Sequence, residues 1–100
     1  MIAIYTTEQF DKWFVELRDK QAKARIQVRI DRAELGNLGD HKAVGSGVFE
    51  MRITYGPGYR IYFKKHGHEV VVLLAGGDKS TQSDDIAKAI QLASELELET

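Results

Sequence analysis

The residues best suited to chemistry are cationic and phenolic side chains in the second half of the chain. Arg52 lies in a segment in which apolar and polar residues alternate. The next such segment has Arg60, Tyr62 and Lys64 at every second position. Alternate residues of a strand face the same side, so we expect these four on one face of a β-hairpin. Their charges repel one another, and a phosphate chain relieves that repulsion. The pattern indicates an RNA-binding face; the alternative is a sheet face made soluble by cations.

Other familiar chemical motifs are absent from the sequence. The run Gly76-Gly77-Asp78-Lys79-Ser80 lacks the glycine spacing of a nucleotide phosphate loop, although Lys79 can still hold one phosphate at the start of a helix. The three histidines lack metal-ligand spacing, and either a surface position or a proton-shuttle role is open to them. No cysteine and no G-x-S-x-G motif is present. The sequence therefore predicts no metal, no cofactor and no covalent intermediate.

Charge is segregated along a chain whose formal net charge is -1. Residues 1–40 are balanced, residues 41–79 carry six cations against three anions, and residues 80–100 carry one cation against five anions. An anion-binding function is therefore expected in the middle block. An acidic last helix folded over that block would partly shield it.

Length and composition are those of one small domain. A chain of 100 residues with 43% apolar residues builds a single core, so we expect one domain spanning residues 1–100. With no cysteine, no leader-like N-terminus and no long apolar run, the expected location is cytoplasmic, without membrane contact.

Two helices are expected after a short strand at residues 2–5. Thr6-x-x-Gln9 fits a capping box, and an apolar stripe follows it at helical spacing, formed by Phe10, Trp13, Phe14 and Leu17. The inner face of the second helix consists of Ala22, Ile26, Ile30 and Ala33. Gly36 and Asn37 end that helix, and the two helices form a hairpin.

The second helix also carries a basic ridge of Arg25, Arg29 and Arg32, spaced i, i+4 and i+7. Such a ridge can contact nucleic acid or an acidic partner. Charged outer faces of helices are more often only solvated, and we adopt that interpretation.

The second half of the chain predicts a β-meander. Residues 48–55 and 59–65 form an antiparallel hairpin around Gly56-Pro57-Gly58. A three-residue loop places Tyr55 opposite Tyr59. Residues 69–75 form a central strand, residues 76–79 form a turn, and Ser80 or Thr81 caps a last helix. The fold class is α+β, in the order β-α-α-β-β-β-α.

Five motifs together resemble the phage-derived addiction-module killer proteins, which are similar to HigB-type toxins of the RelE/ParE superfamily. These motifs are Gly39-Asp40-x-Lys42, Gly45-x-Gly47-Val48, Glu50-x-Arg52, Gly56-Pro57-Gly58-Tyr59-Arg60-x-Tyr62 and Leu74-x-Gly76-Gly77-Asp78-Lys79-Ser80-Thr81-Gln82. The resemblance implies a RelE-like, microbial-ribonuclease-like fold with an antiparallel sheet. It also implies cleavage of mRNA, usually at the ribosome, and a helix-turn-helix antitoxin as partner.

The resemblance also implies site residues. Arg52 and Arg60 match the family's arginines and Lys79 its loop lysine, and we expect the arginines to stabilise the charge that develops when a ribose 2′-hydroxyl attacks the adjacent phosphate. Tyr62 joins this catalytic set. Expected RNA-binding residues are Lys42, Lys64 and His41. The general acid and base stay open among Lys42, Tyr62, His41 and Glu50.

Three functions compete: an mRNA endonuclease toxin, a ParE-like inhibitor of DNA gyrase with no reaction of its own, and a protein with only an interaction role. Under the first, Arg52→Ala and Arg60→Ala each abolish growth arrest without changing the fold. The nuclease hypothesis fails if the two arginines lie on opposite sides of the sheet, or if each of them is locked into an internal carboxylate pair.

Overall fold

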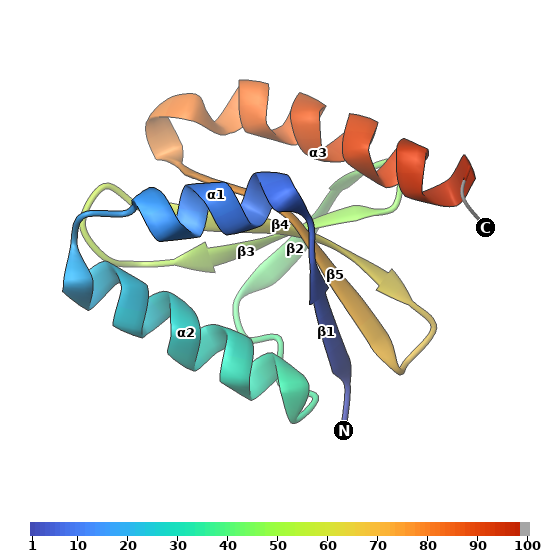
Figure 1. The fold of residues 1–100 in the computed structure, drawn as a ribbon, viewed down its shortest axis with the longest axis horizontal. Coiled ribbons are helices and arrows are strands. Elements are labelled where there is room, and N and C mark those ends of the chain that lie inside the picture. The colour runs from blue at the N-terminus through green and yellow to red at the C-terminus, as the bar shows by residue number, and fades with distance from the viewer. Residues whose placement is uncertain (99–100) are drawn as a thin grey trace.

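A five-stranded sheet organises the chain, in the spatial order β1-β5-β4-β3-β2 (Figure 1). The structure is a computed structural model and describes residues 1–98. Neighbouring strands are antiparallel except β1 and β5, which are parallel. The strands are β1 (Ala3–Thr6), β2 (His41–Gly45), β3 (Val48–Ile53), β4 (Tyr59–His66) and β5 (Val70–Asp78).

The helices are α1 (Glu8–Glu16), α2 (Lys20–Glu34) and α3 (Gln82–Leu98), with a 3-10 turn, η1 (Lys79–Thr81), before the last. The predicted order β-α-α-β-β-β-α is present, with β2 as an additional strand. The sequence of β2 shows no clear alternation and the strand lies at the sheet edge, so no periodic pattern indicated it. No helix of the described residues is long and apolar enough to cross a membrane.

The first helix begins one residue later than predicted. Thr7, not Thr6, is its N-cap: the Thr7 hydroxyl accepts a hydrogen bond from the Phe10 amide at 3.1 Å and donates one to the Leu74 carbonyl at 2.6 Å. The capping box of Thr6 and Gln9 was wrong because Thr6 is still paired in β1. The predicted end of α2 is confirmed, since Gly36 adopts φ +92° directly after the helix.

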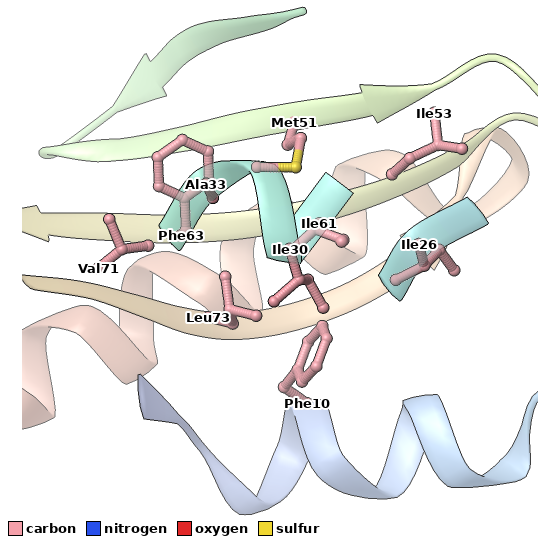
Figure 2. Close-up of a cluster of buried hydrophobic side chains, with 10 residues drawn as sticks. All are labelled: Phe10, Ile26, Ile30, Ala33, Met51, Ile53, Ile61, Phe63, Val71 and Leu73. Carbon is pink, nitrogen blue, oxygen red and sulfur yellow. The ribbon is translucent and has the colours of Figure 1, made fainter. Parts of the chain in front are cut away.

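One core lies between the sheet and the hairpin of α1 and α2. Figure 2 shows Phe10 of α1 and the inner face of α2 pointing at side chains of β3, β4 and β5. The predicted inner residues of α2 are all buried. Burying each large side chain contributes about 1.5–3 kcal/mol, so this layer holds the helical hairpin on the sheet.

A second core lies on the opposite face, under α3. Tyr62, Leu74 and Ala75 of the sheet are buried against Ala89 and Ala93 of the helix. The two alanines let the helix approach the strands closely. The face expected to be polar and open is therefore largely covered by α3.

The β3–β4 hairpin has the predicted faces but a different register. Ile53 pairs with Tyr59 and Arg52 with Arg60, whereas Tyr55 had been expected opposite Tyr59. The loop is five residues long because Tyr55 and Gly58 close a turn, with the Gly58 amide donating to the Tyr55 carbonyl at 3.0 Å. A shift of two residues leaves every side chain on its predicted face.

The last strand extends through two glycines that had been assigned to a turn. A Cβ on Gly76 would lie 2.2 Å from the Trp13 ring, and one on Gly77 would lie 1.8 Å from the Asp85 carboxylate. Glycine is needed at both positions for this close approach, not for a turn. Asp78, rather than Ser80 or Thr81, caps the following turn, accepting from the Ser80 amide at 2.8 Å.

Candidate functional site

Two arginines expected to act together lie on adjacent strands and on one face. Arg52 of β3 is directly opposite Arg60 of β4, and both line a hollow of about 360 Å³ at the end of the sheet. Asp40, Thr54 and Tyr59 also line it. The structure therefore meets the first condition of the nuclease hypothesis.

Arg52 forms an ion pair that is open to solvent. Its Nη2 lies 2.8 Å from Asp40 Oδ1, and the two side chains are 40% and 52% exposed. The hydrogen bond from Arg52 holds the pKa of Asp40 below its ordinary value. Exposed pairs of this kind are weak, typically about 0–1 kcal/mol, so a phosphate can compete for the guanidinium.

Arg60 forms a buried ion pair. Its Nη1 lies 2.6 Å from Glu50 Oε1, and the side chains are 14% and 0% exposed. The second Glu50 oxygen accepts a hydrogen bond from Gln82 Nε2 of α3 at 2.8 Å. Both arginines therefore have a carboxylate partner, but the pair locks Arg60 and not Arg52, because the Arg52 pair is exposed and the Arg60 pair is buried.

Tyr62 is fully buried between β4 and α3. Its hydroxyl has no hydrogen-bond partner among the described residues. Burial, followed by the negative charge of Glu50, raises the pKa of Tyr62 above its ordinary value. Tyr62 is therefore a neutral phenol without exposed surface, and its catalytic role stays a prediction.

The other predicted site residues are dispersed. Lys79 is exposed on η1, with its Cβ side next to the turn glycine Gly58, at the same end of the sheet as Arg60. Lys42 is exposed on β2, opposite Glu50. Lys64 is buried, at 8% exposure, between Val48 and Val72 in register.

His41 lies apart from these cations. Its ring packs against Phe49 and Phe63, with centroids 6.2 and 6.0 Å away, and its Nδ1 lies 2.9 Å from the Gly39 carbonyl oxygen. Phe63 belongs to the core on the α1–α2 face. His41 is thus on the opposite face of the sheet from Arg60.

Sequence reasoning missed the role of Arg29. Its guanidinium reaches from α2 to the carbonyl oxygens of Arg52, Leu38 and Asp40, the latter two at 3.1 and 3.2 Å. Gly39 makes room for it, since a Cβ there would lie 2.7 Å from Arg29 Nη2. Arg29 fixes the loop that carries Asp40 to Arg52. No periodic signal identifies an arginine whose partners are backbone carbonyls.

The basic ridge of α2 also lies beside the sheet site. A hollow of about 430 Å³ between α2 and β3 is lined by all three ridge arginines, with Val28, Asp40, Arg52, Ile53 and Thr54. The first hollow is also lined by four of these residues, which are Asp40, Arg52, Ile53 and Thr54. The two hollows therefore share the Arg52 pair. Arg25 and Arg32 are exposed, as expected of a solvated face, and they also line a hollow.

Among the side chains that the structure describes, those of residues 1–96, no group of three or more histidines, aspartates or glutamates is placed to hold a metal ion. The site is defined by its arginines.

Comparison with known proteins gives consistent results. Residues 12–96 match the family described as Phage derived protein Gp49-like (DUF891). An uncharacterized protein of Haemophilus influenzae is 52% identical over 97 residues, which cover 97% of this chain and 98% of that protein.

Two solved structures are similar in fold. A chain of the intact E. coli RelBE toxin-antitoxin complex superposes with a TM-score of 0.66 at 14% identity, covering 78% of this chain and 96% of that chain. A conserved hypothetical protein of Helicobacter pylori gives a TM-score of 0.57 at 15% identity, covering 80% of this chain and 97% of that chain. The predicted RelE-like α+β fold is thereby confirmed, and the narrower HigB-like assignment stays a prediction.

Proposed function

This chain belongs to the phage-derived Gp49-like protein family, and from that premise we propose that it is the toxin of a type II toxin-antitoxin pair and that its target is RNA. The observation that carries the proposal is the gathering of five arginines around two adjoining hollows in a protein whose net charge is -1. Positive charge concentrated in a hollow attracts a polyanion.

The partner in this proposal is an antitoxin of the helix-turn-helix class. The similar E. coli chain comes from an intact toxin-antitoxin complex. An antitoxin that covers the arginine-lined hollows would block access to RNA, and the toxin would act on mRNA, at the ribosome, when that cover is lost.

The proposed reaction is attack of a ribose 2′-oxygen on the adjacent phosphate. The new O–P bond closes a 2′,3′-cyclic phosphate, the bond from phosphorus to the 5′-oxygen of the next nucleotide breaks, and the proton lost by the 2′-hydroxyl is balanced by one gained by the 5′-oxygen. The reaction requires cations that stabilise extra negative charge on the phosphate oxygens. Arg52, whose pair with Asp40 is exposed, and Lys79 are the cations in a position to do so. Arg60 loses the transition-state role expected from the sequence, because Glu50 engages it. It becomes a positioning residue that holds β3 and β4 in place.

Growth arrest and RNA mapping test the proposal together. We expect induced wild-type protein to stop growth and to leave discrete breaks in ribosome-bound mRNA by primer extension. Arg52→Ala should abolish both, because it removes the exchangeable cation, while its thermal unfolding stays close to wild type. Lys12→Ala, which removes an exposed cation on α1, serves as the matched control and should remain toxic.

Two results would contradict the proposal. DNA damage with intact mRNA would favour gyrase inhibition, and absence of any toxicity would favour a protein with an interaction role only. A fully toxic Arg52→Ala variant would remove Arg52 from the site.

A further inference from the structure

We propose that the hollow between α2 and β3 is a second phosphate-binding subsite, which holds the RNA strand beyond the phosphate at Arg52. The inference rests on the proposed function, because it extends the same site. It gives Arg25, Arg29 and Arg32 a ligand that the sequence did not assign to them.

The charge balance of this hollow favours an anion. Four arginines line it, and Asp40 is the one carboxylate in its lining. Asp40 is already paired with Arg52, although its charge also acts on Arg29. Among the side chains of residues 1–96, no carboxylate forms an ion pair with Arg25, Arg29 or Arg32. The unneutralised charge of the site is therefore on α2 rather than on the sheet.

Two of the ridge arginines are held in place before any ligand arrives. Arg29 is bound to three backbone carbonyls, and burial lowers the pKa of its guanidinium. Arg25 lies over the Tyr55 ring, 4.5 Å from its centroid, an arrangement that fixes the guanidinium plane. Carbonyls and an aromatic face orient these cations without cancelling their charge, which leaves the charge for a phosphate.

The spacing of the ridge indicates an extended ligand rather than a single small anion. Arg25 and Arg32 are seven residues apart on α2, which is about 10.5 Å along a helix at 1.5 Å per residue. One phosphate reaches both guanidinium groups only if the two side chains bend toward each other, whereas a strand offers successive phosphates along this distance. The two hollows share Arg52, so the proposal routes one strand through both.

The lining favours RNA over an acidic peptide. All four cations are arginines, whose planar forks bind phosphate through two hydrogen bonds and stack on bases. The exposed Arg25 and Arg32 are assigned this role, whereas Arg29 contributes its charge, because backbone carbonyls already engage its Nη atoms. The exposed Val28, in the same lining, provides an apolar surface for a ribose or base. Continuity with the cleavage site supports the same choice.

Binding of a fluorescein-labelled oligouridylate, followed by fluorescence polarisation at several salt concentrations, tests the subsite. The variant is Arg25→Gln with Arg32→Gln, which keeps Arg29 and thus the loop. Lys12→Gln with Lys88→Gln is the control, since it removes the same charge from exposed positions on α1 and α3. We expect the ridge variant to bind about tenfold more weakly, with a salt slope smaller by about 1.4 for two lost phosphate contacts. The control should bind like wild type.

Three outcomes would overturn the subsite: an unchanged affinity in the ridge variant, an equal loss in the control variant, or displacement of the oligouridylate by polyglutamate more readily than by unlabelled RNA. The last outcome would assign the hollow to an acidic peptide. RNA cleavage by wild type together with unchanged affinity in the ridge variant refutes the subsite alone. Ridge-dependent RNA binding without cleavage refutes the endonuclease alone.

Discussion

Arg60→Ala removes the cation that contacts the buried Glu50 carboxylate. In the native protein Glu50 is 0% exposed and lies 2.6 Å from the arginine. After the substitution the carboxylate keeps its hydrogen bond from Gln82 at 2.8 Å. Leaving a buried charge without its partner typically costs about 3–5 kcal/mol, and the remaining hydrogen bond places this case at the lower end.

A loss of about 3 kcal/mol is large for a domain of this size, since small domains are stable by about 5–15 kcal/mol. It corresponds to a fall in the melting temperature of about 12–24 °C. We therefore expect Arg60→Ala to lower the melting temperature, contrary to the expectation from the sequence that it leaves the melting temperature unchanged. A loss of toxicity in this variant would not by itself identify Arg60 as a catalytic residue.

Urea unfolding followed by circular dichroism measures the effect directly. Arg52→Ala is the internal comparison, because it breaks an exposed pair and should cost at most about 1 kcal/mol. Adding Glu50→Gln to Arg60→Ala removes the stranded charge, and we expect the double variant to be more stable than Arg60→Ala alone. Equal costs for Arg52→Ala and Arg60→Ala, or a double variant no more stable than the single one, would refute the buried-pair reasoning.

Three further predictions concern the glycines of β5, the hydrogen bonds from Arg29 to the loop that carries Asp40, and the carboxylate of Asp85. Gly76→Ala should lower the free energy of unfolding by about 1–3 kcal/mol, because the new Cβ meets the rigid Trp13 ring. In Gly77→Ala the new Cβ meets the flexible carboxylate of Asp85, so adding Asp85→Ala should restore the stability of that variant. Urea unfolding measures both effects. Arg29→Lys keeps the charge but not the fork, and we expect a loss of about 1.5–3 kcal/mol, whereas a purely electrostatic role predicts no change. Burial raises the pKa of Asp85, so its contribution to stability is present at acid pH and is lost as pH rises through that pKa. Asp85→Asn should therefore be more stable than wild type at pH 7, with the difference gone below about pH 3.9, and an equal difference at both pH values would contradict this.

Periodic patterns in the sequence predicted the elements whose side chains repeat on one face. The stripe of α2 from Ala22 to Ala33 is buried as expected, and the two faces of the β3–β4 hairpin are assigned correctly because side-chain alternation survives a shift of two residues. The register itself depends on the turn after Ile53, whose length is set by backbone hydrogen bonds that no side-chain pattern encodes.

Elements fixed by single contacts were not predictable in the same way. Gly76 and Gly77 have the composition of a turn, and only the positions of Trp13 and Asp85 explain why they lie in a strand. The candidate site was partly predicted, since Arg52 and Arg60 do share a face. The carboxylate partners of these arginines were not predicted. Asp40 precedes β2, a strand without a periodic signal, and Glu50 is buried by α3.

The parallel pairing of β1 with β5 places the first strand of the chain beside its last strand, as Figure 1 shows. Ala3 pairs with Val70 and Thr6 with Leu73, so β1 has no neighbour in the sheet until almost three quarters of the polypeptide has been synthesised. Contacts between such distant residues close slowly, because the loop entropy is lost before any contact is gained. During translation the nascent chain therefore cannot complete its sheet before residues 70–73 are available to pair with β1.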